Sequence, residues 1–525
     1  MAQWIPAETA NEWVTGDEEV AFVDVREVAR YGEGHPLLAA NVPLSTLEID
    51  VLRVVPRTST RIVLTDGDGS LTELAANALE RVGYNNVHIL EGGASGWIKS
   101  GLTLFPEIEV PGKAFGAFAR EAGRPQSITP AALKRALAAN EDVVVLDSRP
   151  HAEYARGNIP GSIAAPAGEA LRCFKDLVPS PSTKVVINCM SATRGTLGAL
   201  MLNAANVPNP VFFLQHGTRG WQLDEHELEV GAMRHAKPPS AEALAFAQEK
   251  VAAMLKRARV PVIDTEQWAA WKGDGTRTTF TVDVRTPAEF AAGHVAGSLN
   301  APEGAVVMGP QEYFATLNAR VVLLDDDGVR AGVAASWLSQ MGLAEVYVLR
   351  NGLRDAPIRK GPYEGNRPSA NGIRRISAEE LDLMRENGSV RLVDVGHSHA
   401  YARQHIPGAR WCSRAEAGAF LMSANFAFPT VLTSEDGLVA ELTAVEFGHS
   451  LSVLRGGNES WATSGRELTN DRGEYICARH DRWLASSERP GDQKRNVIDY
   501  LGWEDELMRA VERAGKYPFK NLLWI

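Results

Sequence analysis

The stretch KVVINCMSATRGTLGALMLNAANV, residues 184–207, decides how the rest of the chain is interpreted. Its apolar, β-branched start predicts a buried strand, and the residues from 196 onward predict a helix. Between them lies NCMSATRG, residues 188–195, which contains one of only four cysteines in the chain. A cysteine between a buried strand and the start of a helix needs an explanation, and other copies of the same frame supply it.

The frame around this stretch recurs four times in the 525 residues. Each copy has an apolar run ending in aspartate (AFVDVRE, VVVLDSRP, TFTVDVRTP and VRLVDVGH), then a second apolar run that ends in a polar loop (IVLTDGDG, VVINCMSA, VVLLDDDG and TVLTSEDG). A third marker closes each copy: EGGASGW, QHGTRGW, RNGLRDA and RGGNESW. The residues that open the four loops are Asp66, Cys189, Asp325 and Ser434. They follow the earlier aspartate by 42 residues in three copies (66 − 24, 189 − 147, 325 − 283) and by 40 in the fourth (434 − 394).

These markers stay in step and therefore predict four tandem repeats. Strands that are apolar throughout and alternate with helices are typical of a parallel sheet covered by helices on both faces. The sequence thus predicts an α/β fold for each repeat, with a ligand site beyond the carboxyl ends of its strands. The predicted segments are 1–110, 120–235, 255–362 and 372–465 for the first to fourth repeats, and 466–525 for a C-terminal extension.

The composition excludes several classes of protein. With 45% hydrophobic and 23% charged residues, the chain is neither disordered nor fibrous. The net charge of −11 counts against nucleic acid or an anionic membrane as the main partner. The start of the chain, MAQWIPAETANEW, lacks the pattern of a secretory signal, and no apolar run is long enough to cross a membrane. Four sparse cysteines predict neither a disulfide framework nor a metal site, and they favour a reducing cytoplasm.

The combination of Asp-x-Arg, a turn such as GNIPGS, the loop after the central strand and the closing G-G-x-x-x-W segment resembles the rhodanese superfamily. The resemblance covers most of residues 1–465 and implies a rhodanese fold in each repeat and a four-domain sulfurtransferase overall. In tandem members of this family one domain typically keeps the cysteine, and here Cys189 alone stands at the loop position. Asp66, Asp325 and Ser434 replace it elsewhere, and the fourth repeat has Gly396 in place of the arginine, so these three repeats are expected to be catalytically silent.

The chemistry of sulfur transfer explains a cysteine at this position. Thiolate is the nucleophile, and a free cysteine with a pKa of about 8.5 is mostly protonated at neutral pH. A loop that wraps round the sulfur and leads into a helix offers N–H groups and a positive helix end, so we expect a lowered thiol pKa. Arg194 follows at Cys-x4-Arg spacing and suits an anionic donor. The intervening residues, expected to lend mainly their N–H groups, are Met190, Ser191, Ala192 and Thr193.

Three further residues are candidates for the same site. Arg149 follows Asp147 by two residues, and three of the four repeats keep this pair, so we interpret it mainly as a tie between strand and loop. The charge of Arg149 would also favour substrate binding. His216 and Arg219 follow the next strand and are candidates for the rim of the cleft.

The remaining notable residues have plainer interpretations. Cysteines outside the loop are expected to be small buried hydrophobes, although Cys173 would suit a resolving thiol. The acidic runs 66–69 and 323–328 lack the ligand spacing of a calcium loop and predict polar turns. The extension has a helical stretch near 503–514 that is expected to dock on a domain, and one interpretation is a lid over the cleft of the second repeat. The other cysteines and the tryptophans expected in cores are Cys173, Cys412, Cys477, Trp97, Trp221 and Trp461.

The sequence therefore predicts a cytoplasmic sulfurtransferase that carries sulfur as a persulfide on Cys189. The resemblance implies thiosulfate or 3-mercaptopyruvate as donor and a thiol or cyanide as acceptor, with a protein acceptor as a further option. No metal or organic cofactor, nucleic acid or membrane is implied. Two alternatives stay open: a redox sensor or scaffold with one reactive cysteine, and, more remotely, a cysteine-dependent phosphatase, whose loop is Cys-x5-Arg.

Overall fold

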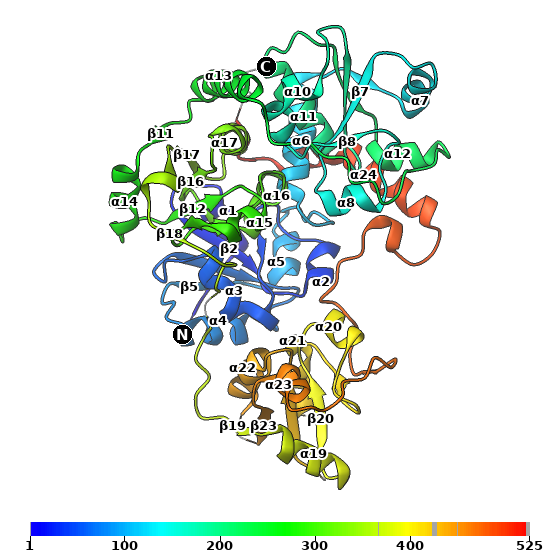
Figure 1. Ribbon diagram of the computed structural model, residues 1–525. Helices are drawn as coiled ribbons and strands as arrows, with labels where there is room; N and C mark the ends of the chain where they lie inside the picture. The colour runs from blue at the N-terminus through cyan, green and yellow to red at the C-terminus, as the bar shows by residue number, and fades with distance from the viewer. Residues whose placement is uncertain (1, 366, 423–427, 449, 521–525) are drawn as a thin grey trace. The chain divides into compact units, whose positions relative to one another are not determined.

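The computed structural model describes residues 2–365, 367–422, 428–448 and 450–520. The chain forms two compact units. One consists of Met1–Val14, Val20–Ile108 and Gly365–Leu484, and the other of Thr15–Glu19, Glu109–Glu364 and Ala485–Ile525. The first and fourth repeats thus belong to one unit, and the second and third repeats belong to the other together with the end of the chain. Figure 1 labels helices and strands of each repeat.

The first repeat is a parallel sheet flanked by helices. Its elements are β1 (Gln3–Ile5), α1 (Ala7–Val14), β2 (Val20–Asp24), α2 (Val28–Glu33), β3 (Ala40–Asn41), η1 (Leu44–Thr46), α3 (Leu47–Val54), β4 (Arg61–Thr65), α4 (Thr72–Arg81), β5 (Val87–Leu90) and α5 (Gly93–Lys99). The strands pair in the order β1-β5-β4-β2-β3, and each pair is parallel. The order places β4, the strand before the loop, in the middle of the sheet.

The second repeat has the same plan, preceded by helix α6 (Val110–Gly123). Its elements are β6 (Ser127–Ile128), α7 (Pro130–Ala138), β7 (Val143–Asp147), α8 (His151–Arg156), β8 (Ile163–Ala164), α9 (Glu169–Arg172), α10 (Phe174–Leu177), β9 (Lys184–Asn188), α11 (Thr193–Ala204), β10 (Val211–Leu214) and α12 (Gly217–Leu223). The strands follow the order β6-β10-β9-β7-β8, again all parallel.

The central strand and helix of the second repeat are buried as their sequence predicts. Four of the five residues of β9 are buried, because both faces of the sheet are covered. Helix α11 is apolar on nearly all sides, and ten of its twelve residues are buried. Two glycines make this packing tight: a Cβ at Gly198 would press on Ile187, and one at Gly116 of α6 would overlap Thr193. The loop between β9 and α11 is therefore held inside the domain.

The third repeat follows the connecting helix α13 (Ala241–Ala258). Its elements are β11 (Val262–Ile263), α14 (Thr265–Gly273), β12 (Thr279–Asp283), α15 (Pro287–Ala292), β13 (His294–Val295), β14 (Leu299–Asn300), α16 (Glu303–Met308), η2 (Pro310–Glu312), β15 (Thr316–Leu317), β16 (Arg320–Leu324), α17 (Val329–Met341), β17 (Glu345–Leu349), α18 (Gly352–Asp355) and β18 (Ile358–Arg359). The main sheet has the order β11-β17-β16-β12-β14, and β13 pairs antiparallel with β18.

The fourth repeat has the same arrangement of strands and helices. Its elements are β19 (Arg374–Ile376), α19 (Ala378–Glu386), β20 (Arg391–Asp394), α20 (Ser398–Arg403), β21 (Arg410–Trp411), α21 (Arg414–Met422), β22 (Thr430–Thr433), α22 (Leu438–Phe447), β23 (Leu451–Leu454), α23 (Gly457–Thr463) and β24 (Glu474–Tyr475). The sheet order is β19-β23-β22-β20-β21-β24. The added strand β24 comes from the start of the extension and pairs parallel with β21. The predicted fold class, four repeats each with a helix-covered parallel sheet, is confirmed.

The closing tryptophans lie in the cores, as predicted. Trp97, Trp221 and Trp461 are all buried. Each donates its indole N–H to the backbone carbonyl six residues further on, at 3.1, 2.9 and 3.1 Å respectively. A buried indole needs a partner for its N–H, so this bond fixes both the ring and the chain that leaves the domain.

The end of the chain is a long helix, α24 (Gln493–Ala514), which follows the short turn η3 (Ser486–Glu488). The helix begins ten residues before the predicted stretch because the Asp492 carboxylate caps it by accepting the N–H of Arg495 at 3.1 Å. Its buried face includes Leu507, Met508 and Val511, so the expected docking on a domain is observed. Within the unit that contains the second repeat, α24 packs against α6.

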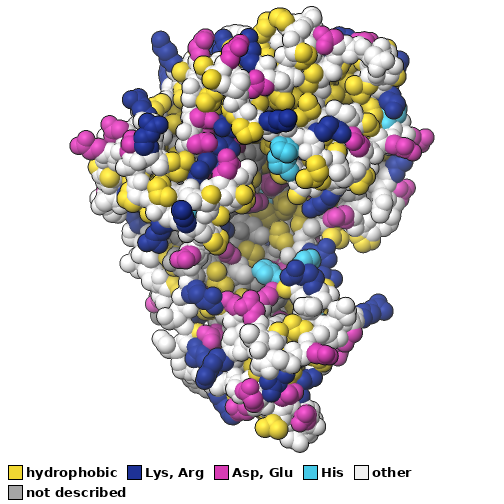
Figure 2. Space-filling model, in the orientation of Figure 1, with side chains coloured by type: hydrophobic (Ala, Val, Ile, Leu, Met, Phe, Trp, Pro, Cys, Tyr) yellow, Lys and Arg dark blue, Asp and Glu magenta, His cyan; other side chains and the backbone are white. Residues whose placement is uncertain are grey.

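The surface matches an acidic chain of mixed charge. On the face drawn in Figure 2, basic and acidic side chains are interspersed rather than gathered into one large patch. Among the described residues, none of the helices has the length and apolar character needed to cross a membrane.

Candidate active site

The loop that carries Cys189 is braced by the start of helix α12. The Cys189 carbonyl accepts the backbone N–H and the hydroxyl of Thr218, both at 2.9 Å, and the Met190 carbonyl accepts the N–H of Arg219 at 3.0 Å. This approach requires Gly217, whose φ is 52° and whose Cβ, if present, would overlap the Cys189 carbonyl. The loop backbone is thus fixed independently of any ligand.

The sulfur of Cys189 lies inside this loop and is almost completely buried, at 2% exposure. The N–H groups of Gly195 and Ser191 hydrogen-bond to it, and Arg194 adds a favourable charge. The Ser191 N–H group is among those expected from the sequence, whereas the Gly195 N–H group is not. Burial nevertheless raises the pKa of the Cys189 thiol to about 11, despite Arg194 and the two N–H groups, and the Glu504 carboxylate adds to the increase. The expected lowering of the pKa is therefore absent in this closed state, because the cover over the loop removes water from the thiolate.

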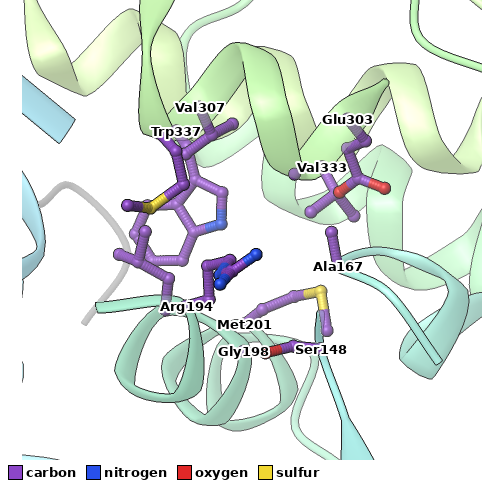
Figure 3. A pocket seen from close by; sticks show the side chains of 12 residues that line it. Ser148, Ala167, Arg194, Gly198, Met201, Glu303, Val307, Val333 and Trp337 are labelled. Atoms are coloured by element: carbon purple, nitrogen blue, oxygen red, sulfur yellow. The ribbon is translucent and has the colours of Figure 1, made fainter. Parts of the chain in front are cut away.

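Arg194 does not extend freely toward a donor site. Its guanidinium donates to both carboxylate oxygens of Glu153, at 3.0 and 2.9 Å. The side chain borders a narrow pocket of about 30 Å³, in which Trp337 and Glu303 of the third repeat lie opposite (Figure 3). In Figure 3 the Arg194 guanidinium rises from α11 between Met201 and Trp337. A donor that binds this arginine would have to share it with Glu153.

Arg149 is tied into the sheet edge. Its guanidinium donates to both oxygens of Asp147, at 2.9 and 2.8 Å, and to the carbonyl of Gly157 at 2.8 Å. The first and third repeats form the same three-part contact with Arg26 and Arg285, although neither has a loop cysteine. The contact supports the strand end in every repeat that keeps the pair.

The other predicted residues differ in their proximity to the sulfur. Ala192 forms the N-cap of α11, and Met190 is half-buried beside Cys189. His216 adopts a left-handed backbone conformation before α12, with φ of 53°, and none of the hydrogen bonds described here joins its ring to the loop. Cys173 is buried and donates to the carbonyl of Lys237 at 3.3 Å; burial raises its thiol pKa to about 12.

One residue at the site was not predicted. Glu504 of helix α24 accepts the hydroxyl hydrogens of Ser191 and Thr193 with the same oxygen, Oε1, at 3.1 Å each. Glu504 is buried, and no residue in the described part of the chain hydrogen-bonds to its second oxygen. The aromatic and apolar pattern of the tail predicted a docked helix, but no local signal distinguishes this glutamate from the exposed acids beside it.

A larger cavity of about 800 Å³ lies between the second and third repeats. It adjoins the narrow pocket, since both are bordered by Ser148, Glu303 and Gly304. Burial raises the pKa of the Glu303 carboxyl well above its usual range. The basic and imidazole side chains that line the cavity are Arg172, Arg330, Lys237, His151 and His235.

One group of acids in the described structure is close enough to share an ion: the ligand oxygens of Asp325, Asp326 and Asp327 lie within 4.8 Å of one another. All three side chains are already engaged, and Asp326 accepts the Arg330 guanidinium at 2.7 Å. Asp325 accepts N–H groups of its own loop, and Asp327 accepts Arg172 at 2.7 Å. The group therefore behaves as part of a polar turn.

Comparison with known proteins agrees with this arrangement. A family model described as rhodanese-like domain matches residues 7–100, 129–224, 264–355 and 377–464. A thiosulfate sulfurtransferase from Pseudomonas aeruginosa is 26% identical over 234 residues, which cover 37% of this chain and 84% of that protein. Thiosulfate sulfurtransferase GlpE from Pseudomonas fluorescens is 32% identical over 97 residues, 18% of this chain and 87% of the relative.

The agreement extends to nearly the whole chain in one solved structure. A crystal structure of a thiosulfate sulfurtransferase from Pseudomonas aeruginosa superimposes with a TM-score of 0.93 and 34% identity, covering 98% of this chain and 99% of the other. Together with four matches to one family model, this shows what the repeats are. The chain belongs to the rhodanese-like family, as an enzyme of the sulfurtransferase type with four tandem domains and a loop cysteine in the second.

Proposed function

We propose that the protein moves a sulfane sulfur from an anionic donor to a thiophilic acceptor through a persulfide on Cys189. The observation that carries this proposal is the position of the sulfur: it lies within a loop whose Gly195 and Ser191 N–H groups hydrogen-bond to it, with Arg194 alongside. Backbone N–H groups and a cation in this position stabilise a thiolate and, later, the charged outer sulfur of a persulfide. The names of the relatives support thiosulfate as one usable donor.

The cycle balances without an added oxidant or reductant. The Cys189 thiolate attacks the outer sulfur of thiosulfate, the S–S bond of the donor breaks, and sulfite leaves with the bonding electrons. With 3-mercaptopyruvate, pyruvate would leave after a proton is supplied. A thiolate or cyanide then attacks the outer sulfur of the persulfide and releases the Cys189 thiolate, so the enzyme alternates between two forms.

The closed state must change for this cycle to run. Cys189 is almost fully buried and its pKa is raised to about 11, so little thiolate is present near neutral pH. Reaction therefore requires part of the cover over the loop to move, which would expose the sulfur and restore the influence of the N–H groups and Arg194. The cavity between the second and third repeats supports a route for an acceptor of moderate size.

Two alternatives receive less support. An oxidant sensor does not require a cation that binds an anionic donor, whereas Arg194 lies beside the Cys189 sulfur. A phosphatase loop would place five residues between the cysteine and the arginine, whereas four separate Cys189 from Arg194. We also propose a reducing, cytoplasmic location, which the four free cysteines support.

The proposal is tested by intact mass spectrometry after treatment with thiosulfate and then with cyanide. The expected result is the gain of one sulfur atom that cyanide removes, complete loss of this gain in Cys189→Ser, and no change in Cys173→Ser. If thiosulfate gives no gain, mercaptopyruvate is tried next. Failure of both donors in a folded protein whose Cys189 is readily oxidised by peroxide would contradict sulfur transfer.

A further inference from the structure

The C-terminal helix places a carboxylate against the reactive loop. Glu504 Oε1 accepts hydrogen bonds from Ser191 and Thr193, which are two of the four residues between Cys189 and Arg194. Glu504 is 4% exposed, and its Oε2 atom has no hydrogen-bond partner among the described residues. A buried carboxylate with one oxygen that lacks a hydrogen bond carries a desolvation cost, so its presence beside the loop calls for an explanation.

Cation–π contacts hold the helix that carries Glu504 against its neighbours. The Arg219 guanidinium lies over the Tyr500 ring, 4.2 Å from its centroid. The Lys113 ammonium lies 5.5 Å from the Tyr500 ring centroid and 5.7 Å from that of Trp503. These cation–π contacts hold α24 on the second repeat from two sides, so the position of Glu504 over the loop is well defined.

The Glu504 carboxylate opposes negative charge on the Cys189 sulfur, which must ionise in order to react. Glu504 contributes to the raised pKa of Cys189, against the opposing influence of Arg194 and the loop N–H groups. The Glu504 carboxylate would also repel an anionic sulfur donor that approaches Cys189. The repulsion of a dianionic donor would be about twice that of a monoanionic donor. Charged side chains on the elements packed round the loop include Asp147 at the end of β7, Arg149 after it, Glu153 on α8, Lys113 on α6, Arg194 on α11, Arg219 on α12 and Glu504 on α24.

We propose that Glu504 is a specificity-determining residue, which disfavours dianionic donors such as thiosulfate and directs Cys189 toward organic persulfides. This inference rests on the proposed sulfurtransferase function and narrows its donor class. The Cys189 thiolate would attack the outer sulfur of a persulfide R–S–SH, break its S–S bond and release R–S⁻, so that the outer sulfur and its proton move to Cys189. The leaving group carries one charge, whereas sulfite carries two.

The test compares Glu504→Gln with the neighbouring Asp505→Asn. Glutamine keeps an oxygen that can accept from Ser191 and Thr193 but removes the charge. Asp505 is half-exposed and pairs with Arg120 at 3.1 Å on the surface, so its variant makes the same change of charge outside the site. The donors are thiosulfate and hydroxyethyl persulfide, whose organic group is uncharged.

In Glu504→Gln we expect kcat/KM for thiosulfate to rise about tenfold and the value for hydroxyethyl persulfide to change less than about twofold. Asp505→Asn and the charge-retaining Glu504→Asp should keep the wild-type ratio between the donors. Equal changes with both donors, or no change with either, would overturn the proposal, because a purely structural role would not separate donors by charge.

A second measurement separates this proposal from the proposed function. The rate at which iodoacetamide alkylates Cys189 at fixed pH needs no sulfur transfer, and it should rise about tenfold in Glu504→Gln but not in Asp505→Asn. An unchanged rate would overturn the electrostatic role of Glu504. Failure of every variant to accept sulfur from either donor would instead overturn the sulfurtransferase function, whatever the alkylation rates.

Discussion

The loops of the second and third repeats share one frame and differ in the group at its centre. In the third repeat the Asp325 carboxylate accepts the backbone N–H groups of Gly328, Arg330 and Ala331, at 2.6, 2.9 and 3.2 Å. The corresponding position in the second repeat holds the Cys189 sulfur. The third loop therefore places N–H groups round an acidic side chain even where no thiol is present, and the central residue decides whether a carboxyl group or a nucleophile accepts their hydrogen bonds.

The arginine that ends each loop is also held in the same way. Arg194 donates to both oxygens of Glu153, at 3.0 and 2.9 Å, and Arg330 donates to both oxygens of Glu289, at 3.1 Å each. Because the pair persists in a repeat without a thiol, it serves the shape of the loop in both. Only in the second repeat does the arginine also lie beside a reactive group.

The most demanding test is to move the nucleophile. In a Cys189→Ser background, Asp325→Cys should restore a thiol that gains sulfur from thiosulfate and loses it to cyanide. The reason is that the backbone N–H groups of the third loop are already in place. We expect a rate at least about tenfold below that of the wild type, since the carboxylates of Asp326 and Asp327 oppose the thiolate. Peptide-resolved mass spectrometry would locate the added sulfur.

Two controls make this test decisive. Asp325→Ser in the same background should gain no sulfur, and Cys189→Ser alone should be inactive. If the thiol at position 325 can be alkylated but never takes up sulfur, then the loop N–H groups alone are not sufficient for sulfur transfer. The difference between the repeats would then lie in substrate access.

The sequence predicted this frame well because it depends on local patterns. Apolar strands, their constant spacing and the single loop cysteine can be recognised without tertiary information, and the observed sheets follow them. Glu504 could not be found in this way, since it lies 313 residues from its partner Ser191 along the chain. The apolar Leu507 and aromatic Trp503 predicted a docked helix, but not the surface it covers.

The same limit explains the thiol pKa. The N–H groups and Arg194 follow from the loop pattern, and alone they would lower the pKa of Cys189. Burial depends on α6, α24 and the third repeat, whose packing against the loop cannot be derived from residues 184–207. The raised pKa of about 11 is thus a tertiary effect superimposed on the local influence of the loop.

Substitution of the loop arginine should affect sulfur loading in the second repeat but not in the third. We expect Arg194→Gln to slow sulfur loading about 100-fold, because it removes a charge beside the sulfur and the donor. Arg330→Gln, the matched change in the third repeat, should leave loading unchanged although it breaks the pair with Glu289. Loading would be followed by the release of sulfite in single-turnover reactions.

Both variants must be checked for folding, since each removes the arginine that pairs with a partly buried glutamate. Circular dichroism and thermal unfolding would provide that check. Equal losses of activity in two folded variants would show that the arginines support the loops in the same manner, and would remove the case for donor binding by Arg194.

The pH dependence of thiol reactivity tests the closed state. Only the thiolate is alkylated, so with a pKa of about 11 the rate at Cys189 should rise about tenfold per pH unit, without a plateau below pH 10. Cys173, with a pKa raised to about 12, serves as a buried thiol outside the loop in the same protein. A plateau for Cys189 near pH 7 or 8 would show that an open state with a low pKa controls the reaction.

The smallest expected effect concerns the hydroxyl groups that bind Glu504. Thr193 occupies the position of Val329 in the third repeat, so Thr193→Val makes the second loop more like the third while keeping its volume. The change removes one hydrogen bond to a carboxylate, worth about 1–2 kcal/mol, and should lower hydrogen-exchange protection in α24 about tenfold.

That loss should leave α24 attached, because its apolar face contributes more. Leu507, Met508 and Val511 are each 1% exposed, and burying a side chain of this kind contributes about 1.5–3 kcal/mol. Leu507→Ala should therefore release the helix and speed alkylation of Cys189, whereas Thr193→Val should loosen the helix only slightly. If Thr193→Val released α24 as fully as Leu507→Ala does, the contact with the Glu504 carboxylate, rather than apolar packing, would keep α24 over the loop. Any ligand that competes for the Ser191 and Thr193 hydroxyls would then release the helix.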